Sequence, residues 1–201
     1  MATGDALQKV AGVDVAYDRA GRRCVAAAVV LLSPTLTPLC EACWEGPVEA
    51  PYRPGLLATR EAGPISRALA RLSSLPDLIL VDGHGRAHPR RWGLACAVGA
   101  KVRVPTVGVA KDPLVGRWDE PRPERGRWTP LEDRGEVVGA AVRTRARVKP
   151  VFVSVGWGVG LSEAVRWVLR LSPRYRLPEP IRAAHFRAGQ ILRSSGRGMG
   201  H

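Results

Sequence analysis

The segment Pro76–Val81 most constrains what this chain can fold into, because it is an uninterrupted apolar strand that ends in a charge. Four consecutive apolar residues, Leu78 to Val81, lead directly into Asp82-Gly83-His84-Gly85. Such a run is typical of a strand covered on both faces, so the chain should build a central sheet flanked by helices. Sites in open α/β sheets gather at the carboxyl ends of strands, so Asp82 is either a turn former or a ligand.

Three strands are expected before this segment. Alternating apolar and small residues predict strands over Val10–Tyr17 and Cys24–Leu32, joined by a hairpin turn at Asp18–Arg22. A third strand follows at about Leu36–Trp44. The connections are too short for crossover helices, so the three strands should form an antiparallel meander.

The pattern then changes to alternating helices and strands. Apolar residues at helical spacing predict a helix over Leu56–Leu72, where Pro64 should mark either the first turn after a break or a kink. After the strand that ends at Asp82, we expect a helix at about Arg91–Val102 and a strand at Thr106–Ala110. This β-α-β-α-β succession implies parallel pairing.

The remainder of the chain carries a weaker pattern. Residues 118–135 are rich in Arg, Pro, Glu and Gly and should form a loop, while Glu136–Thr144 and Pro150–Val155 should be strands. An amphipathic stripe from Leu161 to Leu169 predicts a helix with Ser162 as its N-cap. Residues 194–201 have the composition of a disordered tail, and we expect a single domain over residues 1–201.

The charge of the chain points to a polyanionic partner. Lys and Arg total 31 against 18 Asp and Glu, which gives a net charge of +13, and most of the excess is Arg. Arg donates planar, bidentate hydrogen bonds suited to phosphate, so nucleic acid is the expected partner. The alternative is a coding bias toward Arg, Ala, Gly and Pro, with the charge merely solvated.

Nothing in the sequence indicates export or membrane insertion. The longest apolar run, Cys24–Leu32, is far shorter than the roughly 20 residues that a bilayer requires, and no basic leader precedes it. We therefore expect a cytoplasmic protein with no membrane partner. Cys40 and Cys43 lack the second pair or nearby His of a zinc site, so they should be strand or core residues.

Two further acids stand out because of where they lie. Asp14 falls inside the first apolar strand, where a buried carboxylate is costly unless it meets a metal or a partner; its alternative is a place on the polar face. Glu61 lies early in the predicted helix, where a Glu also complements the helix dipole without any other role. A meander joined to a parallel α/β half, with isolated acids on its strands, is the plan of the ribonuclease H-like fold.

Taken together and in order, several segments resemble the motifs of the endonuclease V family. The similarity runs from about residue 9 to residue 185. The matching segments are Gly12–Tyr17, Pro51–Glu61, Pro76–Arg91, Pro105–Lys111, Lys149–Gly156 and Tyr175–Pro180. The resemblance implies an α/β, ribonuclease H-like fold with a mixed central sheet, a meander plus parallel strands, flanked by helices.

The resemblance also implies an activity. Members of the endonuclease V family recognise inosine, the product of adenine deamination, in DNA or RNA. They hydrolyse the second phosphodiester on the 3′ side of the inosine, in DNA repair or in the turnover of inosine-containing RNA. Mg²⁺ is the implied cofactor, with Mn²⁺ able to substitute, because the attacking and leaving oxygens need charge neutralisation. By analogy with the family, Asp14 and Asp82 would be direct metal ligands, and Glu61 would bind the metal directly or through water.

Three nitrogen-bearing side chains are candidates for contact with the phosphate or the lesion. Lys111 ends a Gly-Val-Ala-Lys motif, where its ammonium can hold the scissile phosphate or stabilise developing charge; the alternative is a solvated lysine. His88 can orient water or contact phosphate, or be a structural histidine bonded to the backbone. His84 lies between two glycines near the proposed metal, or is only a loop residue.

The lesion itself needs a wedge and a pocket. The resemblance assigns the wedge to Tyr52, which would fill the gap left by an extruded base and which is stiffened by prolines within Pro51-Tyr52-Arg53-Pro54. Glycines permit close approach of the backbone to a base, so the pocket is expected around Gly83, His84, Gly85 and Gly108.

This chain departs from the family at Trp157, which stands where many members have a His. Two alternatives therefore remain open: a lesion-binding protein that does not cut, and another ribonuclease H-like nuclease that cuts branched or hybrid substrates. The sequence does not distinguish DNA from RNA or one metal from two, and we expect a monomer.

Overall fold

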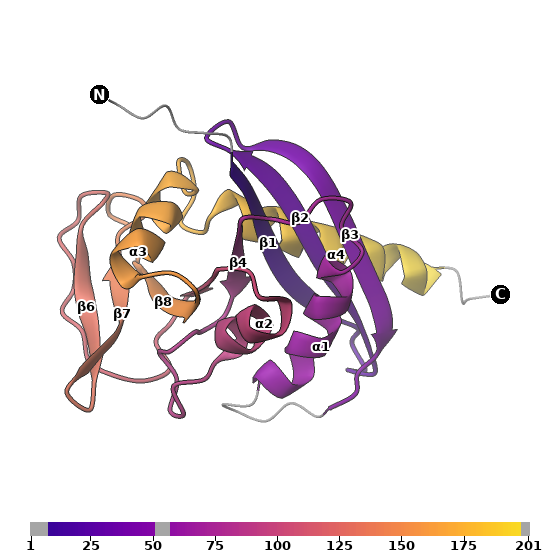
Figure 1. Ribbon diagram of the computed structural model, residues 1–201, viewed down its shortest axis with the longest axis horizontal. Coiled ribbons are helices and arrows are strands. Elements are labelled where there is room, and N and C mark those ends of the chain that lie inside the picture. Colours follow the sequence, from indigo (N-terminus) through magenta and orange to yellow (C-terminus); the bar gives the residue numbers. More distant parts are fainter. Residues whose placement is uncertain (1–7, 51–56, 198–201) are drawn as a thin grey trace.

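A computed structural model describes residues 8–50 and 57–197, and the strands within these ranges form one sheet (Figure 1). In this described part the sheet has eight strands in the order β3-β2-β1-β4-β5-β8-β7-β6. The strands are β1 (Gln8–Tyr17), β2 (Arg23–Ser33), β3 (Thr37–Pro47), β4 (Leu78–Asp82), β5 (Thr106–Ala110), β6 (Trp128–Asp133), β7 (Glu136–Val142) and β8 (Val151–Trp157).

The N-terminal half of the sheet confirms the predicted mixed architecture. β1, β2 and β3 form the antiparallel meander, and β4 and β5 then add in parallel beside β1. In the first parallel pair, Val13 of β1 lies opposite Val81 of β4. Asp14 and Asp82 are each the next residue along, so the two acids reach the same edge of the sheet on neighbouring strands.

Helices cover both faces of the sheet. One apolar cluster joins α1 and α2 to Val13 of β1, and a second joins α3 and α4 to Leu80 of β4. This burial on two sides explains why the run before Asp82 is apolar throughout. The helices are α1 (Leu57–Leu69), α2 (Leu94–Val102), α3 (Leu161–Arg170) and α4 (Glu179–Arg197).

The region expected to be a loop contains a strand. β6 lies within residues 118–135 and pairs antiparallel with β7 at the edge of the sheet. The sequence does not indicate this strand, because Pro130 argues against a strand and is tolerated only at the edge of a sheet. The buried Leu131 of β6 packs on Val138. β8 pairs antiparallel with β5 and continues to Trp157, past the expected end at Val155.

Two predicted helix starts are wrong, and one of the two alternatives for Pro64 is excluded. Pro64 lies in the middle of α1, where it is buried, so it does not mark a first turn, which leaves the alternative of a kink. α2 begins at Leu94 and not at Arg91, because Arg91 has a left-handed φ of 54° that no α-helix allows. Ser162 is already inside α3, whose N-cap is Gly160 and makes no side-chain cap hydrogen bond.

The helix α4 has no counterpart among the expected elements. It continues to Arg197, so residues 194–197 are helical and do not belong to a frayed tail. It lies directly on β1, because a Cβ at Gly12 would come within 2.0 Å of the Pro180 carbonyl group. In Figure 1 the yellow α4 passes behind β1 and β2, opposite α1. No helix in the described ranges is long and apolar enough to cross a membrane.

Candidate functional site

Asp14 lies within β1, directly after the last residue that pairs with β4, and Asp82 ends β4, so the two acids lie side by side on the same face of the sheet. Their side chains are 15% and 22% exposed, respectively. Both point toward the layer of α4, since Gly12 and Leu80, two residues earlier on the same strands, contact that layer. Burial raises the pKa of both carboxyl groups, and the charge of Asp14 raises the pKa of Asp82 further.

Glu61 approaches these two acids from the opposite face of the sheet. It lies in α1, is 7% exposed, and accepts at Oε1 a hydrogen bond of 2.8 Å from the Tyr17 hydroxyl. Burial raises the pKa of Glu61 to about 7, and the charges of Asp14 and Asp82 contribute to this rise. We call Asp14, Glu61 and Asp82 the carboxylate cluster.

The donor set of the carboxylate cluster fits a divalent cation. Mg²⁺ and Mn²⁺ prefer hard oxygen ligands, and a positive charge among three acids would reverse the repulsion that raises their pKa values. Within residues 8–50 and 57–197, no three His, Cys, Asp or Glu side chains are arranged so that they could hold one ion together. A metal held by two carboxylates, with the third acting through water, does not need three such side chains to meet at one ion, because Mg²⁺ keeps several of its waters.

Lys111 supplies a cation at the edge of the carboxylate cluster. It directly follows β5, which is the neighbour of β4 in the sheet, and its Nζ lies 4.0 Å from Asp82 Oδ2. The side chain is 52% exposed, so the ammonium group is accessible to an approaching phosphate. The structure thus brings Lys111 to the acids, as the sequence predicts, and its catalytic role stays a prediction.

His185 belongs to the site, and the sequence reasoning missed it. It lies on α4, and its Nδ1 is 2.7 Å from Asp14 Oδ2. The only signal in the sequence is the helical spacing of Ile181, Ala184 and Ala188, which places a helix here and His185 beside its buried stripe. Those small residues make the stripe weak, so the helix and its histidine escape notice together.

A small cavity of about 170 Å³ shares a loop with the carboxylate cluster, because one of its lining residues, His84, follows Asp82 by two positions. Its lining combines apolar side chains with two histidines. We call it the histidine cavity, and it is lined by Leu57, Ala58, His84, His88, Gly93, Leu94 and Leu114.

The two histidines of this cavity are held differently. His84 Nε2 lies 3.0 Å from the carbonyl oxygen of Asp112 and therefore carries the proton, and burial lowers the pKa of His84, which keeps its ring neutral at pH 7. His88 is 6% exposed, and its Nδ1 accepts a hydrogen bond of 3.2 Å from the backbone N–H of Arg90. This bond is the one expected of a structural histidine, and the same ring lines the cavity.

The glycines of the predicted pocket have a different place. Gly83, Gly85 and Gly108 do not line the histidine cavity. A Cβ on Gly85 would lie 2.1 Å from the Val155 carbonyl oxygen, and one on Gly108 would lie 2.6 Å from the backbone nitrogen of Gly85. These glycines therefore allow the loop after β4 to lie flat on β5 and β8. The wedge segment Pro51-Tyr52-Arg53-Pro54 lies outside the described residues, so its role stays a prediction.

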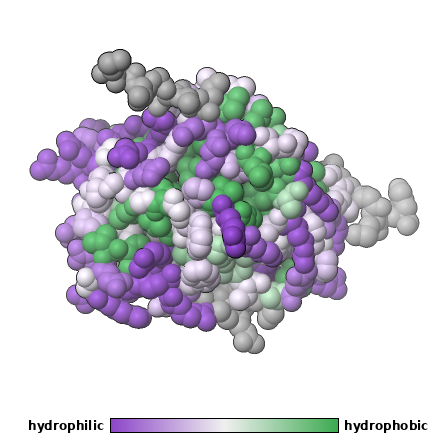
Figure 2. Space-filling model, viewed as in Figure 1, coloured by the Kyte–Doolittle hydropathy of each residue, from purple (hydrophilic) through white to green (hydrophobic). Residues whose placement is uncertain are grey.

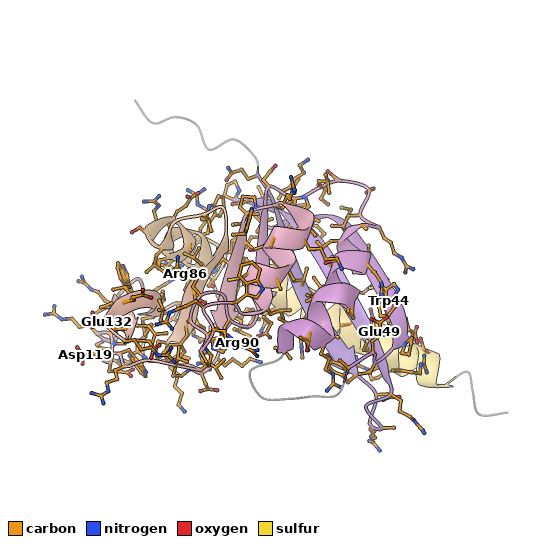
Figure 3. All side chains as sticks on the ribbon, turned by 60° about the horizontal axis from the view of Figure 1, so that its bottom comes forward. Trp44, Glu49, Arg86, Arg90, Asp119 and Glu132 are labelled. Carbon is orange, nitrogen blue, oxygen red and sulfur yellow. The ribbon has the colours of Figure 1, made fainter. Side chains whose placement is uncertain are left out.

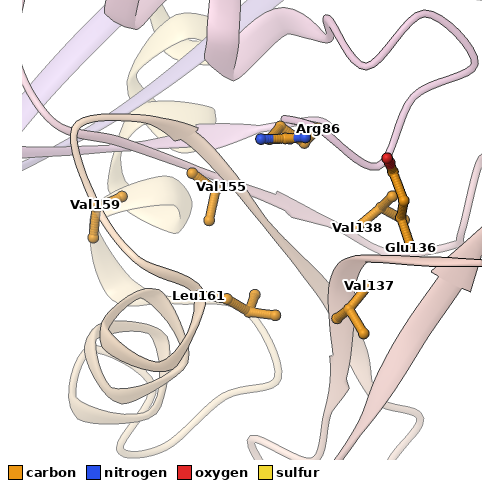
Figure 4. A pocket seen from close by; sticks show the side chains of 7 residues that line it. All are labelled: Arg86, Glu136, Val137, Val138, Val155, Val159 and Leu161. Atoms are coloured by element: carbon orange, nitrogen blue, oxygen red, sulfur yellow. The ribbon is translucent and has the colours of Figure 1, made fainter.

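Two residues after His84, the same loop borders a larger cavity of about 540 Å³ (Figure 4). Arg86 and Glu136 lie at its rim, and aliphatic side chains such as Val155 and Leu161 face one another across it. No member of the carboxylate cluster lines this cavity. It is therefore separate from the candidate site.

The loop after β4 is positively charged on its outer side. Arg86 and Arg90 are exposed and are labelled in Figure 3, and Figure 2 shows hydrophilic residues around the periphery of the molecule. With a net charge of +13 on the whole chain, these cations give the surroundings of the histidine cavity a potential that attracts a phosphate backbone.

A comparison with known proteins identifies the family. The model of the family described as Endonuclease V matches residues 2–186. The chain belongs to the endonuclease V family. It is therefore a nuclease that hydrolyses nucleic acid. The Endonuclease V of Gloeobacter violaceus is 52% identical over 184 residues, which cover 90% of this chain and 75% of that protein.

Solved endonuclease V structures have the same architecture. The crystal structure from Streptomyces avermitilis gives a TM-score of 0.90 at 46% identity and covers 94% of this chain and 82% of that one. The Ciona intestinalis endonuclease V, in complex with a 23mer DNA containing an inosine followed by a ribo-adenosine, gives 0.83 at 28% identity, over 95% of this chain and 88% of that one. These matches confirm the ribonuclease H-like α/β fold of this chain.

Proposed function

We propose that this endonuclease V recognises inosine in a nucleic acid strand and hydrolyses the second phosphodiester on its 3′ side in a Mg²⁺-dependent reaction. The observation that carries the proposal is the carboxylate cluster, whose acids come from β1, α1 and β4 and whose raised pKa values favour a bound divalent cation. The Ciona intestinalis relative bound to inosine-containing DNA supports the choice of lesion.

In this proposal Asp14 and Asp82 hold Mg²⁺, or Mn²⁺ in its place, and Glu61 binds it directly or through water. When bound by these residues, the metal would supply charge neutralisation at the phosphate. The hydroxyl of Tyr17 fixes the carboxyl group of Glu61, and His185 orients Asp14. Both acids are therefore oriented before a substrate arrives, which lowers the reorganisation needed in the reaction.

Lys111 contacts the scissile phosphate in this proposal. Its ammonium group lies close to Asp82, at the exposed side of the carboxylate cluster. A fixed positive charge at that point stabilises the additional negative charge that develops on the phosphate oxygens.

The histidine cavity receives the flipped base. Its volume of about 170 Å³ is below the roughly 300–1,000 Å³ of pockets for drug-sized ligands, so it suits a single ring system. Leu57, Leu94 and Leu114 offer apolar surface to the faces of the ring, and neutral His84 offers a polar atom to its edge. Tyr52 fills the gap that the flipped base leaves in the nucleic acid strand. One chain supplies all of these groups, so a monomer is sufficient for the reaction.

The test is cleavage of matched single strands of DNA and RNA, each with one inosine, with the cut position mapped. We expect a Mg²⁺-dependent nick after the nucleotide that follows inosine, and the ratio of the two rates gives the preferred nucleic acid. Asp82→Asn should abolish nicking and leave binding intact. Asp77→Asn is the matched control, because Asp77 precedes the same strand at its other end, where it accepts a hydrogen bond from Lys9.

Normal nicking by Asp82→Asn would remove the carboxylate cluster from the reaction. Tight inosine-dependent binding by the parent protein with no nicking in Mg²⁺ or Mn²⁺ would favour a lesion-binding protein that does not cut. Faster cleavage of hybrids or flaps than of inosine strands would favour a different ribonuclease H-like nuclease.

A further inference from the structure

The segment after β5, Lys111–Leu114, contributes to the walls of two cavities. Leu114 lines the histidine cavity, whereas Lys111 lines a second cavity of about 180 Å³. We call this second one the tryptophan cavity, because the side chain of Trp118 forms part of it.

The tryptophan cavity has a flat aromatic wall. The rings of Trp118 and Phe152 meet edge to face, with centroids 5.1 Å apart and an interplanar angle of 77°. Phe152 is buried in an apolar cluster with Leu131, and Trp118 packs against the same cluster, so the indole ring is held in one orientation. A held aromatic ring is a surface on which a nucleobase or a sugar can stack at low entropic cost.

Cations dominate the rest of the lining. Glu120 is paired with Arg143, so its charge is already compensated. Lys111 already faces Asp82, so Lys149 and Arg176 remain against the single acid Asp112, which suits a ligand that carries negative charge. The charged lining residues are Lys111, Lys149 and Arg176 against Asp112 and Glu120.

The cations differ in what they already contact. Arg176 Nη2 donates hydrogen bonds to the carbonyl oxygens of Lys111 and Pro150, at 2.6 Å and 2.7 Å, which fixes the segment after β5 to the start of β8. Lys149 is exposed beside this junction. It is the cation of the lining that can extend to a phosphate outside the cavity.

Asp82, one member of the carboxylate cluster, lies close to a lining residue of each cavity. Asp82 is two residues before His84 of the histidine cavity, and it lies 4.0 Å from the Nζ of Lys111 in the tryptophan cavity. A strand with its lesion in the first cavity and its scissile phosphate at Asp82 therefore continues past Lys111 toward Trp118.

We infer that the tryptophan cavity binds the nucleotide on the 3′ side of the scissile phosphate, with its base or sugar against Trp118 and its next phosphate at Lys149. This inference rests on the proposed function, because a cut on the 3′ side of the lesion determines which part of the strand enters the cavity. Binding in the tryptophan cavity would make cleavage depend on nucleotides on the 3′ side of the cut, independently of lesion recognition.

The test uses strands with one inosine, a constant 5′ arm and an increasing number of nucleotides beyond the cut. For the parent, kcat/KM should rise about fivefold once the first nucleotides beyond the cut are present, and should then level off. Lys149→Ala should lose most of this increase because its KM on the longer strands stays high. On the shortest strand its kcat/KM should equal that of the parent. Lys101→Ala, a control at an exposed lysine in the last turn of α2, should keep the whole gain.

Binding provides a readout that does not depend on cleavage. With full-length strands and no divalent metal, Lys149→Ala should reduce the slope of log affinity against log salt by about 0.7. Trp118→Phe should keep the increase of kcat/KM with strand length, and Trp118→Ala should lose it. The unfolding midpoint of both variants shows whether the fold is retained.

Two results separate the inference from the proposed function. If the parent nicks inosine strands but Lys149→Ala has the same length dependence, or if the parent has none, the tryptophan cavity does not hold the 3′ nucleotide. If the parent nicks no inosine strand of any length, the proposed function itself is overturned.

Discussion

Glu61 shows how strongly a single residue in this site depends on its surroundings. Its carboxyl group is buried, close to two other acids, and it accepts a hydrogen bond from Tyr17. The hydrogen bond lowers the pKa of Glu61, but burial and like charge outweigh it. The acid is therefore half protonated near neutral pH in the metal-free protein, which makes the stability of that form depend on pH.

We expect Glu61→Gln to stabilise the metal-free protein at high pH. The pKa of Glu61 is about 7 in the folded state against 4.5 for an exposed Glu, so the unfolded chain loses this proton first as the pH rises. The contribution of Glu61 to the free energy of unfolding is at its most favourable below pH 4.5. It falls as the pH rises and is lost once the pH has passed through about 7. At pH 8 the variant should exceed the parent by about 2–3 kcal/mol, a difference that shrinks toward pH 4.5.

Urea unfolding in the presence of a chelator, at several pH values, measures this difference. Glu163→Gln, at an exposed position in the first turn of α3, is the control. It keeps Glu61, so the difference between its stability and that of the parent should not change with pH. A parent as stable as Glu61→Gln at pH 8 would contradict the high pKa of Glu61.

At this scale the sequence predicts residues whose local pattern is unusual. Asp14 lies inside an apolar strand, and Asp82 and Lys111 lie where apolar strands end; a charge at such a position needs a reason. His185 has no such pattern, because its contact with Asp14 spans 171 residues and exists only in the folded chain. Gly85 carries a signal with two readings, since close approach of backbone to backbone and of backbone to ligand leave the same mark in a sequence; the structure shows the first, and the second stays a prediction.

Among the elements, α4 depends most on a contact that the sequence does not display. Its buried stripe is made of Ile181 and small residues such as Ala184, which allow close packing on β1 but give little hydrophobic periodicity. Pro180 near its start also resembles a break. The edge strand β6 escapes prediction for a related reason, because its Pro130 is tolerated only where no further strand follows.

Gly12→Ala tests the close packing of α4 on β1. The added methyl group would meet the Pro180 carbonyl at 2.0 Å, so the helix must move away from the sheet. We expect the free energy of unfolding to fall by about 2 kcal/mol or more, and cleavage to weaken because His185 moves with the helix.

Gly63→Ala is the matched control for this variant. Gly63 lies inside α1, where an added Cβ meets nothing within 4 Å apart from its chain neighbours. The helix propensity of alanine is opposed by crowding from the following Pro64, so the free energy of unfolding should change by less than about 1 kcal/mol. Urea unfolding of both variants measures the contrast. An unchanged stability of Gly12→Ala would mean that α4 does not lie on β1 as described.

For the whole molecule, the sequence predicts one half of the sheet better than the other. The meander and the parallel strands β4 and β5 follow from short connections and from helices that return the chain. In the other half, β8 pairs antiparallel with β5, and β7 and β6 follow, each antiparallel to its neighbour; this order depends on tertiary pairing rather than on local pattern.

The net charge of +13 should control binding of nucleic acid by the molecule as a whole. Each phosphate contact adds roughly −0.7 for single strands, or −0.9 for duplexes, to the slope of log affinity against log salt. We expect a slope of about −3 or steeper on single-stranded DNA, measured by fluorescence anisotropy from low to physiological salt. An inosine-free strand should give nearly the same slope, and a slope near zero would mean that the charge is only solvated.

The hydrogen bond between His185 and Asp14 also has a consequence for the timing of synthesis. A ribosome adding about 5–20 residues per second needs roughly 9–34 s to travel the 171 residues that separate them. During that interval Asp14 has been made and its histidine has not. The complete site therefore cannot form during most of synthesis, and it assembles only after α4 has been made.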